Sequence, residues 1–273
     1  MSKPSFGRQL GPLEHGRFRA QKGDEGMKSR IAAMASVMAI PVLVSLTGFL
    51  TRHEDGPTAQ TPAASFAILA RDPITGEYGV AAASNAPLIG MNLDFLDKEA
   101  GGVVALGGPF LEINEKVLLA MREGLSPAKA IPVGLFTDSD RERRQVLAIS
   151  TQGTAAFTGK KLAKQAADKV GDYFVAAGHR LENKDVIPAM EEAFLALDGA
   201  LADRLLAALI AGRDAGGEKD GARSAALLVI GPGARFATRD RLLDLRIDFV
   251  SGDAVAALAE LRAQVDSVYE VIN

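Results

Sequence analysis

The feature that most constrains the fold is a hydrophobic hairpin pattern in residues 65–90, SFAILARDPITGEYGVAAASNAPLIG. It opens with Ser65 and runs as an apolar segment to residue 70. A second apolar segment, residues 78–83, follows a turn that contains Asp, Pro and Gly, the residues that tight turns favour. The pattern therefore predicts a buried β-hairpin whose first residue carries a hydroxyl group.

The residues before the hairpin have the composition of an export region. Residues 1–26 are polar and lack a hydrophobic period, which predicts either disorder or a true start further on. Met27 opens a second beginning, in which two basic residues precede an apolar run over residues 31–50. A run of about 20 apolar residues can cross a bilayer, whereas signal-peptide cores span about 7 to 15. Residues 27–50 are therefore predicted to be a signal peptide or a membrane anchor.

The charge order predicts where the rest of the chain goes. Basic residues lie on the N-terminal side of residues 31–50, so the part that follows should leave the cytoplasm. We expect a periplasmic or extracellular protein, tethered through residues 31–50 if the anchor is retained. Residues 51–64, TRHEDGPTAQTPAA, have the composition of a linker or processing region. Residues 65–273 are predicted to form the folded domain.

An export segment followed by a hydroxyl residue is the arrangement that an N-terminal-nucleophile (Ntn) hydrolase requires. In such enzymes the α-amino group of the nucleophile, with a pKa of about 8, takes the proton of its own hydroxyl, and this needs cleavage of the preceding peptide bond. A cut near Ala63 with trimming, or self-cleavage before Ser65, would expose this amine. Ser65 is therefore the candidate catalytic nucleophile, and the alternative is a strand-edge serine with no chemistry.

Composition excludes several other classes of function. The net charge is -3 and the basic residues beyond residue 30 are dispersed, so no nucleic-acid partner is expected. The chain has no cysteine, and its three histidines lie far apart in the sequence. No metal-ligand spacing or phosphate-binding loop is present, and we expect neither a metal site nor a cofactor.

The remaining patterns predict an α+β fold. A third strand is expected in residues 100–108, and further strands and helices are expected downstream. The predicted helices cover residues 112–123, 126–135, 185–197, 201–211 and 253–268, and the predicted strands cover residues 145–150, 154–158, 173–177, 223–230 and 242–250. These elements do not alternate as in a doubly wound fold. Mostly antiparallel sheets covered by paired helices fit better, and they allow a four-layer αββα sandwich.

Five segments of the chain carry a resemblance to a known family. In order, they are SFAILARDPITGEYGVAAAS, REGLSPAKA, RRQVLAISTQGTAAFTG, GARSAALLVI and DRLLDLRID. They resemble the bacterial domain-of-unknown-function family called ten twenty-eight, whose members look like Ntn hydrolases and typically open with Thr-Phe-Ser-Ile. The match runs from Ser65 almost to the C-terminus, so the resemblance implies an Ntn-hydrolase-like fold with Ser65 in the place of the family's threonine.

A looser resemblance to proteasome-type subunits suggests partners for the nucleophile. In those proteins a lysine some thirty residues on lowers the pKa of the nucleophile, and a glycine amide at the end of the third strand forms the oxyanion hole. The resemblance implies these roles for Lys98 and for Gly107 or Gly108. The alternative for Lys98, which lies between two acidic residues, is a solvated surface lysine.

Four further residues are candidates for binding the substrate. Asn85 ends the second strand of the hairpin and is either an amide donor near Ser65 or a turn-forming residue. His179 follows a predicted strand, and it is otherwise a surface or core histidine. Arg223 and Ser224 open a buried strand, where ligand groups often gather, although Arg223 can also simply pair with an acid.

The sequence thus predicts a hydrolase of C–N bonds that cleaves an amide of a small molecule or peptide. The alternative is a catalytically silent binding or assembly module on the same fold. The two differ in whether Ser65 ever becomes an N-terminus, because a serine in mid-chain has no amine base. Paired helices on a sheet sandwich often associate in the Ntn superfamily, so we also expect a homodimer.

Overall fold

The computed structural model describes residues 63–107, 111–162, 165–232 and 240–272, all of which belong to one compact unit, Ala59–Asn273. The predicted segments 1–26 and 27–50, and nearly all of 51–64, lie outside the described residues. Within the described ranges, no helix combines the length and the hydropathy that a membrane crossing needs.

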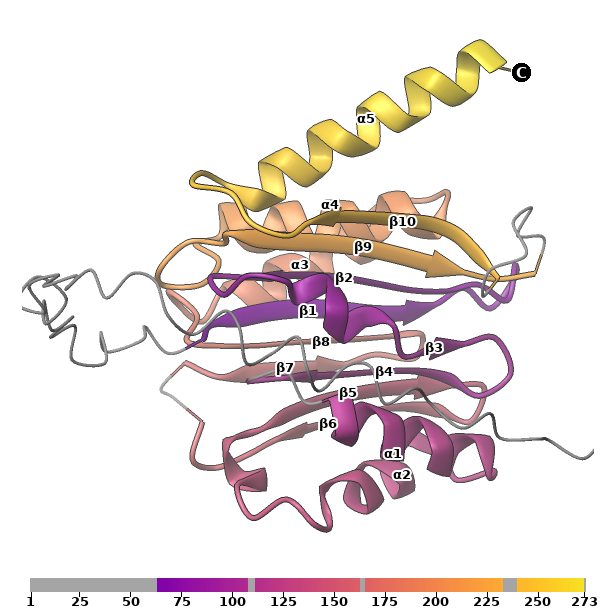
Figure 1. The fold of residues 1–273 in the computed structure, drawn as a ribbon, viewed down its shortest axis with the longest axis vertical. Coiled ribbons are helices and arrows are strands. Elements are labelled where there is room, and N and C mark those ends of the chain that lie inside the picture. Colours follow the sequence, from indigo (N-terminus) through magenta and orange to yellow (C-terminus); the bar gives the residue numbers. More distant parts are fainter. Residues whose placement is uncertain (1–62, 108–110, 163–164, 233–239, 273) are drawn as a thin grey trace, which may run out of the picture. The chain divides into compact units, whose positions relative to one another are not determined.

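Two antiparallel sheets form the centre of this unit (Figure 1). The six-stranded sheet has the order β10-β9-β2-β1-β8-β7, and the four-stranded sheet has the order β3-β4-β5-β6. The strands of the first sheet are β1 (Ser65–Arg71), β2 (Tyr78–Ser84), β7 (Ala167–Val170), β8 (Phe174–His179), β9 (Ser224–Ile230) and β10 (Arg241–Ile247). Those of the second sheet are β3 (Leu96–Asp97), β4 (Gly101–Leu106), β5 (Gln145–Ser150) and β6 (Gly153–Thr158).

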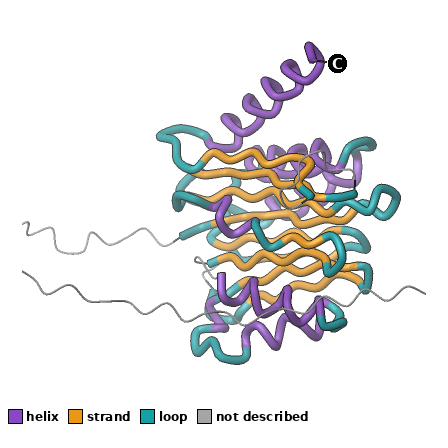
Figure 2. Tube along the Cα trace, turned by 45° about the vertical axis from the view of Figure 1, so that its right-hand side comes forward, coloured by secondary structure: helices purple, strands orange, loops and turns teal. Residues whose placement is uncertain are grey.

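The α-helices lie on the side of each sheet that faces away from the other sheet (Figures 1 and 2). The α-helices are α1 (Leu111–Arg122), α2 (Pro127–Leu135), α3 (Val186–Ala196), α4 (Leu201–Asp214) and α5 (Ala254–Ile272), and the short 3₁₀ helices are η2 (Ile89–Leu93) and η3 (Arg141–Arg143). Helices α1 and α2 pack on the four-stranded sheet, whereas α3, α4 and the start of α5 pack on the six-stranded sheet.

The alternation of side chains along each strand explains this arrangement. In β1, Phe66 and Ile68 enter the core beneath α3 and α4, whereas Ala67 and Leu69 enter the core between the two sheets. Successive side chains of a strand point to opposite faces, so a strand that is apolar at every position is buried on both. The continuous apolar runs of β1, β2 and β9 are the consequence of this two-sided burial.

The structure confirms a mixed α+β fold with antiparallel sheets, including the predicted hairpin. It also differs from the sequence-based expectation in four short elements, β3, β7, η2 and η3, which no pattern predicted. Strand β7 has the sequence ADKV and lies at a sheet edge with largely exposed side chains, so its composition resembles that of a loop. The third strand is shorter than predicted and ends at Leu106.

The register of the six-stranded sheet brings separate parts of the sequence to one edge. Ser65 lies opposite Ser84 on β2 and opposite His179 on β8. Ser84 in turn lies opposite Ser224 on β9. Because neighbouring strands are about 4.8 Å apart, four residues that are distant in the sequence share one end of the sheet.

Candidate functional site

Ser65 is buried at the start of β1, and its hydroxyl is part of a short chain of hydrogen bonds. Its Oγ donates to Oγ of Ser84 at 3.0 Å, and Ser84 Oγ donates to the carbonyl oxygen of Ala64 at 2.8 Å. The backbone N–H of Asn85 also donates to this carbonyl, at 3.3 Å. The carbonyl of the peptide bond before Ser65 therefore has two donors, and one of them is bonded to the Ser65 hydroxyl.

Asn85 holds the same peptide segment from its other side. Its Oδ1 accepts a hydrogen bond from the N–H of Ala64 at 2.8 Å, and its Nδ2 donates to Asp220 at 3.4 Å. The predicted amide donor near Ser65 thus lies beside it, but its backbone N–H, rather than its side chain, points to the carbonyl. The side chain fixes the position of the residue that precedes Ser65.

His179 contacts the residue one place further upstream. Its Nε2 lies 3.1 Å from the carbonyl oxygen of Ala63, which only accepts hydrogen bonds, so Nε2 carries the ring proton. Burial lowers the pKa of His179 to about 4, outweighing the hydrogen bond to Ala63, and the nearby Arg180 lowers it further. His179 is therefore a neutral donor that holds the upstream segment.

Glu218 is a buried carboxyl in the loop between α4 and β9 that sequence reasoning missed. It is 3% exposed, and neither carboxyl oxygen has a hydrogen-bond partner of normal geometry among the described residues. Burial raises the pKa of Glu218 to about 8. The backbone N–H of Asn85 lowers this pKa in part, whereas the negative charge of Asp220 raises it. The surrounding AGGEKDGAR sequence resembles a solvated loop, so no sequence signal marks this residue.

A cavity of about 360 Å³ opens beside Ser65. Residues of three separate segments line it: Ala63, Ser65, Ser84, Ala86, Pro87, Leu88, Ile89, Met91, Asn92, Leu106 and Gly107. None of these side chains is charged. Gly107 has a φ of +95°, and a Cβ there would lie 3.1 Å from a backbone oxygen, so the chain needs glycine at this point. Gly108 lies outside the described residues.

The segment that walls this cavity is fixed at both of its ends. At the first end, Ser224 Oγ accepts a hydrogen bond from the N–H of Ile89 at 3.2 Å and donates to the carbonyl of Ala86 at 2.7 Å. Ser224 is fully buried. It was predicted to contact substrate, but here its hydroxyl bonds the backbone of the cavity wall.

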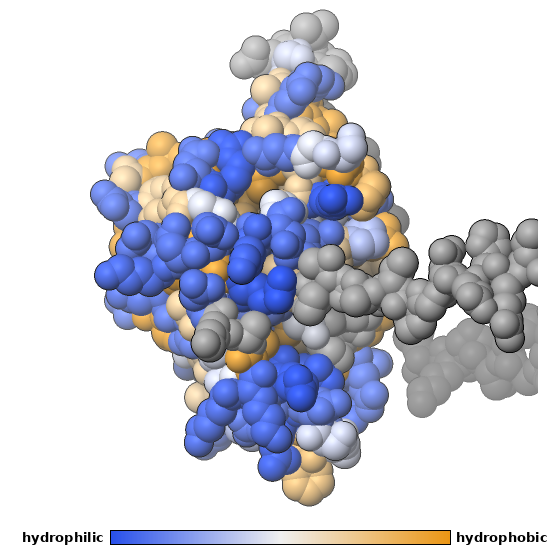
Figure 3. Space-filling view, turned by 90° about the vertical axis from the view of Figure 1, so that its left-hand side faces the viewer, coloured by the Kyte–Doolittle hydropathy of each residue, from blue (hydrophilic) through white to orange (hydrophobic). Residues whose placement is uncertain are grey.

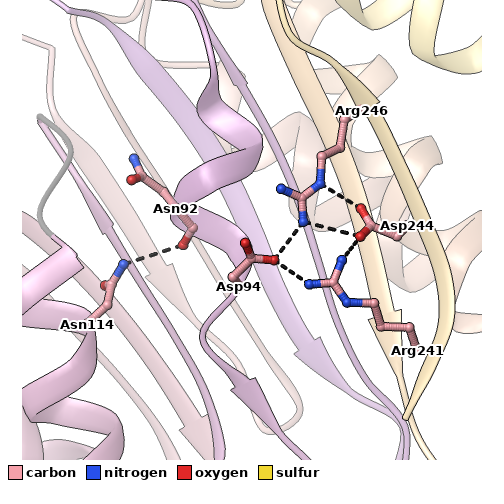
Figure 4. Close-up of polar contacts among 6 residues, drawn as sticks. All are labelled: Asn92, Asp94, Asn114, Arg241, Asp244 and Arg246. Carbon is pink, nitrogen blue, oxygen red and sulfur yellow. Dashed lines mark hydrogen bonds and ion pairs between the residues drawn. The ribbon is translucent and has the colours of Figure 1, made fainter. Parts of the chain in front are cut away.

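At the second end, Asp94 binds two arginines of β10 (Figure 4). Arg241 and Arg246 each approach its Oδ1 at 2.6 Å, and Asp244 pairs with both. Burial alone would raise the pKa of Asp94, but the hydrogen bonds and charges of the two arginines outweigh it and hold the pKa below its usual value. The alternating charges of β10 therefore serve to anchor the end of η2.

Two predicted site residues, Lys98 and Arg223, do not line the cavity beside Ser65. Lys98 is exposed in the turn before β4 and pairs with Asp240 at 2.9 Å. The start of β4 packs near Leu69, since a Cβ on Gly102 would lie 3.0 Å from its side chain, and Leu69 is about 13 Å along β1 from Ser65. The structure thus puts Lys98 at the opposite end of the sheets, because β4 runs antiparallel to β1.

Arg223 is exposed, and its side chain is not part of the cavity wall. Its guanidinium lies 5.9 Å from the centre of the Phe249 ring, and its backbone N–H donates to the carbonyl of Ser84 at 2.8 Å. It therefore contributes to the site only through the backbone that positions Ser84.

A larger cavity, of about 710 Å³, surrounds Lys98. We place the candidate site at the smaller cavity, because only that one adjoins Ser65. Both cations that line the larger cavity are in ion pairs, Lys98 with Asp240 at 2.9 Å and Arg122 with Asp97 at 2.6 Å. Among the described residues, no group of three or more His, Asp or Glu side chains is arranged to hold a metal ion.

The outer surface at this end of the sheets differs from the cavity. Figure 3 views the side at which β1 begins, and hydrophilic residues predominate on it. The uncharged, largely apolar lining beside Ser65 is thus a local property of the cavity.

Comparison with known proteins identifies a family and a similar solved structure. Residues 65–258 match the model of a family described as "Family of unknown function (DUF1028)". The structure is similar to the crystal structure of protein SPO2555 from Silicibacter pomeroyi, which is assigned to the same family model, with a TM-score of 0.67 and 35% sequence identity. The similarity covers 74% of this chain and 88% of that one. No curated protein matches the chain.

Proposed function

Since this chain belongs to the DUF1028 family, whose model matches residues 65–258, we propose an activity for it from its own residues. We propose that it is an exported amidohydrolase of the N-terminal-nucleophile type, with Ser65 as the nucleophile once the preceding bond is cut. The two facing antiparallel sheets with helices on their outer sides support the proposed four-layer αββα classification.

One observation carries the proposal. The carbonyl oxygen of Ala64 accepts hydrogen bonds from Ser84 Oγ and from the N–H of Asn85, and the Ser65 hydroxyl is bonded to the same Ser84 oxygen. Donors directed at a carbonyl oxygen stabilise the negative charge that develops when a nucleophile attacks its carbon. The peptide bond before Ser65 is thus held in a site suited to its own cleavage.

The first proposed step is this cleavage. Ser65 Oγ attacks the carbonyl carbon of Ala64, a C–O bond forms, the C–N bond to Ser65 breaks, and the hydroxyl proton passes to the departing nitrogen. Water then hydrolyses the resulting ester, releasing the carboxylate of Ala64 and restoring the Ser65 hydroxyl. The chain now begins at Ser65 with a free α-amino group.

The second proposed step uses the same donors on a substrate. The free amine takes the hydroxyl proton as Ser65 Oγ attacks the carbonyl carbon of an amide, and it returns the proton to the amine that leaves. Ser84 Oγ and the Asn85 N–H stabilise the oxyanion, as they hold the Ala64 carbonyl before cleavage. Water then releases the acyl group as a carboxylic acid. No cofactor enters the proposed steps.

Turnover of amide substrates tests this function. Protein purified from an exporting host is offered N-acyl amides of a fluorescent aminocoumarin, beside Ser65→Ala and beside Ser139→Ala as an exposed-serine control. We expect release of the amine by the wild type and by Ser139→Ala, and none above background by Ser65→Ala. Equal release by all three proteins, or no release by a wild-type chain that begins at Ser65, would favour a silent binding module.

A further inference from the structure

The peptide segment before Ser65 indicates where the acyl part of a substrate would lie. This inference rests on the proposed function for its orientation. In the proposed cleavage, Ala64 and Ala63 form the acyl part that is transferred to Ser65. Ala63 lines the 360 Å³ cavity. An acyl chain whose carbonyl takes the place of the Ala64 carbonyl would therefore extend along this cavity.

The cavity lining excludes a charged acyl chain. No lining residue carries a charge, and the ring of His179, which bonds the carbonyl of the lining residue Ala63, is neutral because burial holds its pKa at about 4. Transfer of a charged group into such surroundings is strongly unfavourable without a partner. Arg180 and Asp220 pair with each other at 3.0 Å near Asn85, and neither they nor Glu218 line the cavity.

Two large apolar side chains that line the cavity are partly exposed, and one of them has an unusual backbone conformation. Leu88 and Met91 are each 47% exposed, although both have large apolar side chains. Leu88 also has φ 65° and ψ 32°, in the left-handed region that leucine rarely adopts. Strained residues of this kind cluster at ligand-binding sites, where the surrounding structure holds them in place. Here the ion pairs of Asp94 and the hydroxyl of Ser224 fix the segment that includes Leu88.

Besides the hydroxyl groups of Ser65 and Ser84, the side-chain amide of Asn92 contributes a polar group to the cavity lining. Asn92 is 7% exposed, and its Oδ1 has no hydrogen-bond partner among the described residues. Figure 4 shows that Asn114 bonds the backbone oxygen of Asn92, at 3.4 Å, and not its side chain. A side-chain amide can both donate and accept, so it can bond one neutral polar group but cannot compensate a charge.

We propose that this cavity binds the acyl part of an uncharged aliphatic amide, with at most one neutral polar group placed to meet Asn92. Its volume corresponds to about twelve water molecules in the liquid, which suits a chain of several carbon atoms. Charged acyl groups, such as those of acidic or basic amino acids, are excluded.

Three ligands of equal length test the proposal independently of catalysis. Hexanamide is compared with two amides that carry a charge at the far end of the same six-carbon acyl chain, 6-aminohexanamide and the monoamide of adipic acid. All three are titrated at pH 7 into the Ser65→Ala chain after it has been cut before residue 65 at an inserted protease site, so that the Ala64 carbonyl no longer fills the site and no ligand is turned over. Binding is followed by ligand-observed nuclear magnetic resonance. We expect hexanamide to bind at least tenfold more tightly than either charged amide. From butanamide to hexanamide, affinity should rise about fourfold for each added methylene.

Substitution at the rim locates the binding. Leu88→Gly removes apolar surface and also the strain of the left-handed conformation, so it should weaken hexanamide binding about tenfold without lowering the melting temperature. The control is Ile74→Gly, which removes an exposed apolar side chain from the β1–β2 turn at the other end of the sheet. Equal affinities for the three ligands, no hexanamide binding to the folded chain, or equal effects of the two variants would overturn the proposal.

The outcomes also separate this inference from the proposed function. A chain that binds hexanamide selectively but never hydrolyses an amide would keep the cavity as a ligand site and remove the hydrolase. A chain that hydrolyses amides but prefers charged acyl groups would keep the hydrolase and contradict the cavity assignment.

Discussion

At the scale of single residues, the Ala64 carbonyl is held by two donors that differ in how they can be tested. The Asn85 donor is a backbone N–H, whereas the Ser84 donor is a hydroxyl that substitution removes. Loss of one donor from an oxyanion site typically slows the reaction by about 100- to 1000-fold. We therefore expect Ser84→Ala to slow formation of the chain that begins at Ser65 by about that factor, as followed by intact mass over time.

Two controls accompany this variant. Ser150→Ala removes a buried serine from the end of β5, and Lys98→Ala removes the lysine that lies at the opposite end of the sheets. Both should leave the cleavage rate within about twofold of wild type. A rate for Ser84→Ala that equals the wild-type rate would contradict the donor role, and a large effect of Lys98→Ala would contradict its distance from the site.

Glu218 predicts an unusual dependence of stability on pH. Its pKa is raised to about 8 in the folded state, from 4.5 for an ordinary glutamate, so the folded state keeps a proton that the unfolded state has lost between these values. The free energy of unfolding therefore falls as pH rises across this window, by about 1.4 kcal/mol for each unit of difference in pKa. Glu218→Gln should match the wild type near pH 4.5 and be more stable, by several kcal/mol, near pH 8.

Urea unfolding at both pH values measures this difference, with Glu182→Gln as an exposed control. His179 also titrates, but it is present in both proteins, so its contribution cancels in the comparison. A stability difference between Glu218→Gln and wild type that does not change with pH would contradict the assignment. A buried carboxyl that lowers stability near neutral pH is also the kind of group that functional sites retain.

At the scale of elements, the wall of the cavity depends on ion pairs between η2 and β10. Asp94→Asn removes the charge that both Arg241 and Arg246 bind in half-buried surroundings. We expect a loss of about 1 to 3 kcal/mol of unfolding free energy at pH 7. Because the pKa of Asp94 is held below its usual value, this loss should shrink as pH falls below about 4, where the unfolded state takes up a proton, and it should vanish once pH falls below the lowered pKa of the folded state.

The matched control is Asp240→Asn, since Asp240 pairs with Lys98 at the exposed surface. Exposed pairs contribute about 0 to 1 kcal/mol, so this variant should stay close to the wild type. Chemical denaturation of both variants at pH 7 and at pH 3 provides the measurement. Equal losses for the two variants would show that the Asp94 cluster does not anchor η2.

Sequence patterns predicted the strands and helices whose buried side chains recur at a regular spacing. They missed the elements that are held in place by contacts with distant parts of the chain. The apolar runs of β1, β2 and β9 and the amphipathic helix α1 follow from local hydrophobicity alone. In contrast, η2 is fixed by Asp94 and Ser224, whose partners lie about 135 to 150 residues away. No local pattern carries that information.

At the scale of the whole molecule, the close approach of β8 to β1 within the six-stranded sheet positions Ser65. On β8, a Cβ added to Gly178 would lie 2.9 Å from Cβ of Phe66 and 3.1 Å from the carbonyl oxygen of Ser65. Gly178→Ala should therefore displace β1 and lower the unfolding free energy by about 1 to 3 kcal/mol. It should also slow cleavage before Ser65.

Gly252→Ala is the matched control, because a Cβ at that position meets no atom within 4 Å. Thermal unfolding and the rate of cleavage are measured on the same preparations. Unchanged stability and cleavage for Gly178→Ala would contradict the close packing of β8 against β1.

The sequence predicted the class of fold and the nucleophile candidate, but not the composition of the site. Antiparallel pairing followed from the order of the elements, yet the register that puts Ser65 between Ser84 and His179 depends on the whole sheet. Lys98 was assigned by counting residues along the chain, and the direction of β4 makes that count misleading. Glu218 and Asn92 gave no sequence signal, because their burial arises only when the loops fold over them.

The measurement that tests the central claim most directly is intact mass, with N-terminal sequencing, of the full chain purified from an exporting host beside Ser65→Ala. The proposed mechanism predicts a wild-type chain that begins at Ser65, and a Ser65→Ala chain that keeps Ala64. A wild-type protein in which Ala64 remains joined to Ser65 would contradict it, because Ser65 would then have no α-amine to act as its base.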